Sequence, residues 1–71
     1  MTVYISPNPG KEQAMATAQQ AAQLLLMQGA VVLMRDDLKE SCYAEGVQYL
    51  PLEECLLRTD VILTIGGDGT I

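Results

Sequence analysis

The sequence contains no histidine. Histidine-based acid–base catalysis, Ser-His-Asp triads and histidine metal ligands are therefore excluded for these residues. Basic residues are also scarce, because 4 lysines and arginines stand against 9 aspartates and glutamates and leave a net charge of −5. A chain with this acidic balance is not expected to bind nucleic acid or an anionic membrane surface.

Cysteine is almost as rare. Cys42 and Cys55 are the only 2 cysteines, and they have neither a CxxC spacing nor neighbouring residues that would complete a metal site. One disulfide between them is arithmetically possible, but two free thiols of a cytosolic protein are the favoured interpretation. A basic leader is missing, and no apolar run approaches the roughly 18–20 residues that span a bilayer. We therefore expect a soluble, cytoplasmic protein with no membrane partner.

Length and composition indicate one small domain. The chain has 71 residues, of which 49% are apolar and 18% charged, and this balance is typical of a globular protein. A single core in a chain below about 70–80 residues rarely supplies more than about 3–5 kcal/mol of stability. We therefore expect these residues to be part of a larger protein.

The first half of the chain predicts a strand, a helix and a second strand. Residues 2–6 alternate and are rich in β-formers, residues 7–10 (Pro-Asn-Pro-Gly) predict a loop, and residues 11–28 have helical periodicity. The expected inner face of this helix consists of Ala14, Ala18, Ala21 and Leu25, flanked by Met15, Ala22 and Leu26. Gly29 predicts the helix stop, and the apolar run at residues 30–34 predicts a strand that is covered on both faces.

The second half predicts a charged loop or short helical turn at residues 35–40, then an edge strand or extended connector at residues 47–52. A short helix is expected at residues 52–58, with Leu52, Leu56 and Leu57 facing inward, and a buried strand at residues 61–65. The resulting order, β-α-β-α-β, predicts an α/β fold with an open, mainly parallel, doubly wound Rossmann-like sheet. Ligands of such sheets bind beyond the carboxyl ends of the strands.

Five residues at that edge carry the chemistry: Gly66, Gly67, Asp68, Gly69 and Thr70. Glycines directly after a strand allow the main chain to bend and its N–H groups to point at phosphate oxygens. Asp68 is suited to accept a proton from an attacking hydroxyl, or alternatively to hold Mg²⁺ beside the phosphates. The competing interpretation is a plain hairpin turn, in which Asp68 bonds its own backbone. Neither a Walker A sequence nor a G-x-G-x-x-G sequence occurs.

The glycine cluster resembles the signature of the superfamily that contains NAD kinases, diacylglycerol and sphingoid lipid kinases, and phosphofructokinases. The surrounding sequence is most similar to the NAD kinase family. That family has an Asn-Pro-Gly-Lys-like turn before a long helix, matched by residues 8–11, a Leu-Glu-Glu helix, matched by residues 52–54, and a strand led by aspartate, matched by residues 60–62. Lipid kinases more often have a Ser-Gly turn and a His/Ala-containing helix, which this sequence lacks.

The resemblance implies phosphoryl transfer from ATP or polyphosphate to the adenosine 2′-hydroxyl of NAD, which gives NADP. Asp68 would then be the catalytic proton acceptor, Asp68 and Gly69 would contact NAD, and Gly66, Gly67 and Thr70 would shape the phosphate cradle. ATP, NAD and Mg²⁺ are the implied cofactors, and a homo-oligomer is the implied assembly of the complete protein. Residues 1–71 would form the N-terminal nucleotide-binding domain, truncated after the glycine cluster and inactive alone. The alternatives are a lipid kinase of the same superfamily and a non-catalytic nucleotide-binding module.

Other polar and soft side chains have simpler interpretations. Asn8 and Lys11 are expected in the loop at the ligand edge, where Lys11 could reach a phosphate, but a solvated lysine at the helix start is the favoured interpretation. Met15, Met27 and Met34 are assigned to the core or its edge. Paired acidic residues at 36–37 and 53–54 are expected on solvated surfaces, and the three tyrosines are too scattered in sequence to form a base-stacking platform.

Overall fold

The computed structural model describes residues 1–66 of the chain. Its elements, in order, are β1 (Thr2–Pro7), α1 (Glu12–Met27), β2 (Val31–Arg35), the 3-10 helix η1 (Asp36–Leu38), β3 (Gln48–Leu50), α2 (Leu52–Arg58) and β4 (Val61–Ile65). Within these residues the strands form a 4-stranded sheet in the order β3-β2-β1-β4, and every neighbouring pair is parallel. The protein is therefore a small α/β domain, as the alternation of strands and helices predicts.

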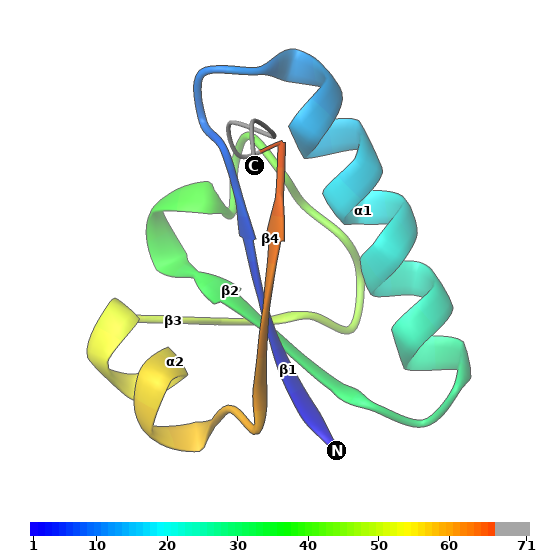
Figure 1. Cartoon of the computed structure of the whole chain (residues 1–71), viewed down its shortest axis with the longest axis vertical. Helices are drawn as coiled ribbons and strands as arrows, with labels where there is room; N and C mark the ends of the chain where they lie inside the picture. The colour runs from blue at the N-terminus through cyan, green and yellow to red at the C-terminus, as the bar shows by residue number, and fades with distance from the viewer. Residues whose placement is uncertain (67–71) are drawn as a thin grey trace.

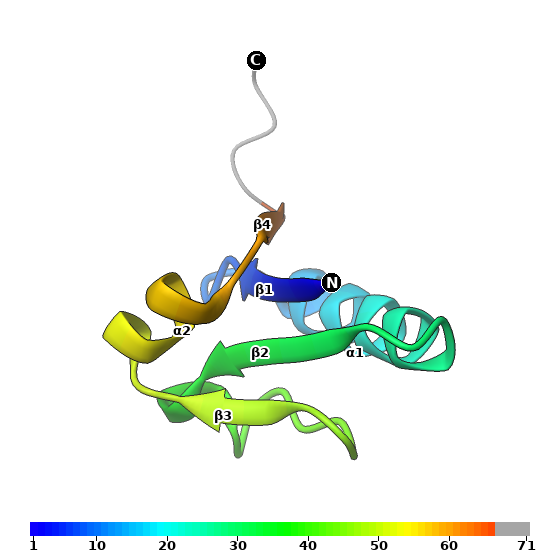
Figure 2. The same ribbon diagram turned by 90° about the horizontal axis from the view of Figure 1, so that it is seen from below.

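The two helices lie on opposite faces of the sheet (Figures 1 and 2). Val3 and Ile5 of β1 belong to the apolar cluster beneath α1, whereas Tyr4 belongs to the cluster beneath α2. Alternate residues of a strand point to opposite faces of a sheet. The central strands β1 and β2 are therefore buried on both faces, and this burial explains their nearly continuous apolar sequences.

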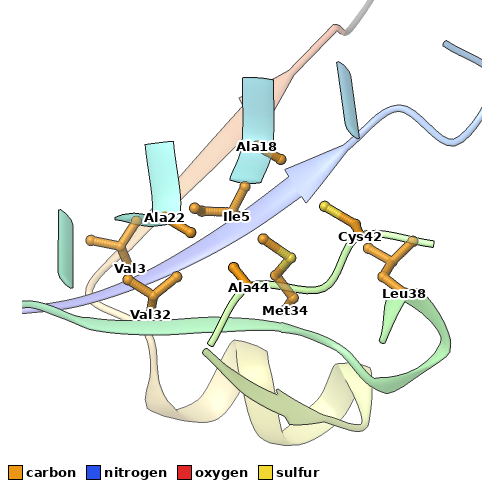
Figure 3. Close-up of a cluster of buried hydrophobic side chains, with 9 residues drawn as sticks. All are labelled: Val3, Ile5, Ala18, Ala22, Val32, Met34, Leu38, Cys42 and Ala44. Atoms are coloured by element: carbon orange, nitrogen blue, oxygen red, sulfur yellow. The ribbon is translucent and has the colours of Figure 1, made fainter. Parts of the chain in front are cut away.

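Small side chains bring α1 close to the sheet. Ala14, Ala18 and Ala22 are buried, and Figure 3 shows the latter two meeting Val3 and Ile5. Ala14 and Ala18 are buried as predicted, but Ala22, expected at the flank, is buried as well, while Ala21, expected on the inner face, is only partly buried. The three buried alanines are four residues apart and lie along one ridge of the helix, whereas the predicted set mixes spacings of three and four residues. Gly29 ends this segment with a positive φ of 88°, as predicted.

The predicted inward side of α2 is wrong. Cys55 is buried against the sheet, whereas Leu52, Leu56 and Leu57 are exposed, Leu57 by 85%. Each residue turns about 100° around a helix axis, so contact of this short helix through Cys55 rotates Leu56 and Leu57 away. Met27, assigned to the core or its edge, is likewise exposed at the last turn of α1.

The strand β4 is not the buried strand that its apolar sequence predicts. It pairs with β1 along one side only, and Val61, Ile62 and Leu63 are all exposed by more than a third. The helices are centred over β1 and β2, so among the described residues nothing covers the outer part of this edge strand (Figure 2). At the opposite edge β3 is short, as expected of an element that precedes Pro51.

Tyr43 and Tyr49 contact each other, although the sequence suggests that the three tyrosines are scattered. Their rings stack, with centroids 6.0 Å apart and planes inclined by 13°. The Tyr49 hydroxyl donates to the Cys42 carbonyl at 2.7 Å and accepts from the Ala44 N–H at 2.8 Å. The stacked pair and these hydrogen bonds fix the segment after η1 against β3. Neither helix of residues 1–66 has the length and apolarity that a membrane-crossing helix requires.

Cys42 and Cys55 are free and buried, which confirms the free-thiol interpretation. They belong to the two apolar clusters on opposite faces of the sheet. The Cys42 thiol donates to the Met15 carbonyl at 3.4 Å, and the Cys55 thiol has the Met34 carbonyl within 3.5 Å. Burial is the main cause that raises the pKa of both thiols above the ordinary value of 9.0.

These raised pKa values predict a loss of stability in alkaline solution. Above pH 9 the thiols of the unfolded chain ionise while those of the folded chain stay protonated, so the free energy of unfolding falls as the pH rises. Urea melts between pH 7.5 and about 9.5 measure this slope below the main ionisation of tyrosine. The Cys42→Ala/Cys55→Ala variant should have a flatter profile; an equally steep one would contradict the assignment.

Candidate functional site

The carboxyl ends of β1 and β4 define the site. The crossover through α1 carries the chain from β1 to β2, which lies on one side of β1. The later crossover through α2 carries it from β3 to β4, which lies on the other side of β1. The direction of winding therefore reverses between β1 and β4. Open parallel sheets bind ligands at this reversal, beyond the carboxyl ends of the strands.

Asn8 joins the two loops that meet there. Its N–H donates to the Ile65 carbonyl at 2.8 Å, which extends the pairing of β1 with β4. Its side-chain amide donates to the Gly66 carbonyl at 2.9 Å, and its side-chain oxygen accepts from the Gly10 N–H at 2.9 Å. Asn8 therefore lies at the carboxyl edge of the sheet, where the sequence places it, and bonds both loops there. No local pattern indicates that the half-buried Asn8 bonds Gly66, because the two residues lie 58 positions apart.

Of the predicted site residues, Gly66 lies at this junction. It has a positive φ of 70°, and a Cβ added there would lie 2.6 Å from the Ala14 Cβ. Gly66 is therefore required for the close approach of β4 to the first turns of α1. Gly67, Asp68, Gly69 and Thr70 lie outside the described residues, and so does the hairpin alternative.

Charge at the carboxyl edge of the sheet is mixed. Three of the 4 basic residues of the chain lie near this edge. Lys11 is in the loop after β1, Arg35 is the last residue of β2, and Lys39 follows η1. Acidic residues nearby in the sequence, such as Glu12 at the start of α1 and Asp37 in η1, offset them. Lys11 is exposed, as predicted, and gives no side-chain cap to α1. Within residues 1–66 no three histidine, cysteine or carboxylate side chains gather to hold a metal ion.

A groove of about 770 Å³ adjoins the junction. Pro9 and Gly10 form one end, the first half of α1 forms a wall, and residues 35–41 form the opposite wall. Gln19 on the α1 wall is oriented by a 2.8 Å hydrogen bond from its Nε2 to the Tyr43 carbonyl. On the other wall, Arg35 Nε lies 3.3 Å from Asp37 Oδ1. The sequence singled out Asp37 only as a solvated residue, because no local pattern indicates that η1 faces α1.

Comparisons of the chain with protein-family models, with curated proteins and with solved structures find no match.

Removal of the Asn8 side chain tests the junction. The Asn8→Ala variant should lower the free energy of unfolding by about 1–2 kcal/mol, because it leaves the Gly10 N–H and the Gly66 carbonyl without their partner. Urea melts of the variant and the wild type measure this difference. Asn8→Asp keeps the acceptor for Gly10 and loses the donor to Gly66, so it separates the two bonds. An Asn8→Ala variant as stable as the wild type would show that the junction contributes nothing to the fold.

Proposed function

We propose that this chain is the N-terminal, Rossmann-like nucleotide-binding domain of an NAD kinase. The proposed reaction transfers a phosphoryl group from ATP or polyphosphate to the adenosine 2′-hydroxyl of NAD. The sequence support is the Gly-Gly-Asp-Gly-Thr cluster at residues 66–70, together with the flanking segments that resemble this family.

One structural observation supports the proposal above the others. The chain leaves β4 beside the loop that follows β1, at the reversal of winding where parallel sheets bind ligands, and Asn8 bonds both loops. A glycine segment that begins there is suited to present main-chain N–H groups to phosphate oxygens. The acidic balance of the nearby side chains makes such main-chain donors more important, since the loops carry no excess of positive charge.

The proposed roles follow from this arrangement. Gly66, Gly67 and Thr70 shape the phosphate cradle, while Asp68 and Gly69 contact NAD. Asp68 accepts the proton of the 2′-hydroxyl of NAD. The oxygen of that hydroxyl bonds to the γ-phosphorus of ATP, and the bond from this phosphorus to ADP breaks. Mg²⁺, when bound with the nucleotide, would neutralise charge on the phosphates. Alternatively, Asp68 would hold this Mg²⁺ instead of taking the proton.

A substrate panel tests the function. The natural protein that contains this chain should release ADP from ATP, or consume polyphosphate, when NAD is present, and the product should be NADP. ADP release that depends on diacylglycerol or a sphingoid base, with none for NAD, would replace the proposal by a lipid kinase. Binding of ATP or NAD by calorimetry without turnover would leave a non-catalytic nucleotide-binding module. No binding and no turnover would exclude nucleotides as ligands and as substrates of this protein.

A further inference from the structure

The strand β4 presents an open edge of the sheet. It pairs with β1 on one side, and among residues 1–66 no strand lies on its other side (Figure 2). Its residues 61–64 are exposed, Ile62 by 50% and Leu63 by 37%. An open edge of this kind offers unpaired main-chain N–H and C=O groups to a further strand. This edge takes no part in the proposed phosphoryl transfer.

The hydrogen bonding to β1 shows which groups of β4 face outward. The Ile65 carbonyl accepts from the Asn8 N–H at 2.8 Å, so the main-chain groups of Ile65 face β1. The N–H and C=O of one strand residue point to the same side, and successive residues alternate between the two sides. Leu63 therefore bonds β1 as Ile65 does, whereas the N–H and C=O groups of Ile62 and Thr64 point away from the sheet.

The edge lacks the features that usually prevent strands of two molecules from pairing. Charged side chains, prolines and bulges serve this purpose in natural sheets. Residues 61–65 contain no charged residue and no proline, and their pairing with β1 continues without a bulge. The carboxylate that precedes them, Asp60, accepts a hydrogen bond from the Thr2 N–H at 2.9 Å and is held toward β1. Two chains of net charge −5 can therefore meet along this edge without like charges in contact.

We propose that a second copy of this chain pairs antiparallel along β4, about a two-fold axis at Leu63. In an antiparallel pair, opposite residues that exchange both hydrogen bonds alternate with opposite residues that exchange none. With Leu63 opposite its own copy, Ile62 lies opposite Thr64 of the second copy, and Thr64 lies opposite Ile62. Every outward N–H and C=O of these two residues then has a partner. An axis at Ile62 would instead place Thr64 opposite Asp60, which lies outside the strand.

The same pairing covers apolar surface on both faces of the sheet. Leu63 is the neighbour of Ile5 in β1, and Ile5 lies in the cluster beneath α1, so the two copies of Leu63 meet on that face. Ile62, the neighbour of Tyr4, covers the opposite face. A contact between two short edges buries less than the roughly 1,200 Å² of standard interfaces, so the dimer is expected to be reversible. It is independent of the proposed kinase reaction, and either proposal can fail without the other.

Cysteine cross-linking of the natural protein tests the register. Opposite residues that exchange no hydrogen bonds have Cα atoms about 4.5 Å apart, within the range of a disulfide, so Leu63→Cys should form a covalent dimer under mild oxidation. Val61→Cys is the matched control on the same strand face, because its two copies would lie roughly 14 Å apart along the strand. Cys42 and Cys55 are buried and common to both variants. No dimer of Leu63→Cys, or equal cross-linking of the two variants, would overturn the proposal.

Analytical ultracentrifugation tests the pairing without a cross-link. The mass of the natural protein should rise with concentration, and Leu63→Lys should weaken this association by at least about tenfold, because two like charges meet at the axis. Val31→Lys should leave the association unchanged, since Val31 is an equally apolar residue, 41% exposed, on a strand that β1 separates from β4. Circular dichroism shows whether both variants are folded. A mass that does not change with concentration, or equal association of the two variants, would refute the dimer and leave the edge to another strand.

Discussion

Replacement of Gly66 by alanine is expected to lower the free energy of unfolding by about 2–5 kcal/mol. A non-glycine residue at its φ of 70° costs roughly 1–2 kcal/mol. The added Cβ would also lie 2.6 Å from the Ala14 Cβ, and relief of such overpacking typically costs a further 1–3 kcal/mol. The obstacle is a buried helix residue with no rotatable side chain, so either β4 or α1 must move.

Gly29 provides the matched control. Its φ of 88° imposes a similar backbone cost, but a Cβ there would meet nothing within 4 Å. Gly29→Ala should therefore lose only this backbone cost of about 1–2 kcal/mol, and the difference between the two variants measures the contact with Ala14. Urea melts followed by circular dichroism suffice for both. Equal losses at the two positions would show that Gly66 is needed for its φ alone.

The sequence predicts the arrangement of this fold better than it predicts burial. Residues 2–6 and 30–34 alternate or run apolar in the way that strands covered on both faces require, and both lie at the centre of the sheet. Residues 61–65 have the same apolar character, yet β4 is an exposed edge strand. Composition cannot distinguish a central strand from an edge strand whose outer side is uncovered. That distinction depends on strand order, which is set by the two crossovers.

The same limit applies to the candidate site. Gly66 was identified from the local glycine pattern, and its positive φ is a local property of the kind that such patterns signal. Asn8 was placed at this edge, but its role was not predicted, because its hydrogen bond to Gly66 needs the pairing of β1 with β4. The groove was missed because Met15 and Asp37 come from segments that only the folded chain brings together. Residues that act through long-range contacts have no periodicity or motif to indicate them.

Substitution of Asp68 by asparagine is expected to reduce the kcat of the proposed NAD phosphorylation by about 10²–10⁴-fold. This is the usual contribution of a positioned general base, and asparagine keeps the size of the side chain while removing its ability to take a proton. The measurement is NADP formation at saturating ATP and NAD by the natural protein. Asp60→Asn is the control, since Asp60 precedes β4 and accepts a hydrogen bond from the Thr2 N–H at 2.9 Å, which an amide oxygen also accepts. Its kcat should stay at the wild-type value.

Metal dependence separates the two roles that the sequence leaves open for Asp68. If the carboxylate acts as the base, Asp68→Asn lowers kcat at every Mg²⁺ concentration and leaves the half-saturating concentration unchanged. If the carboxylate holds the metal, the half-saturating concentration of Mg²⁺ rises and excess Mg²⁺ restores much of the rate, because a neutral amide oxygen binds this hard cation more weakly than a carboxylate does. A variant with wild-type kcat and wild-type metal dependence would exclude both roles. The glycine segment would then bind phosphate through its main chain alone, with the proton of the hydroxyl passing to another group or to solvent.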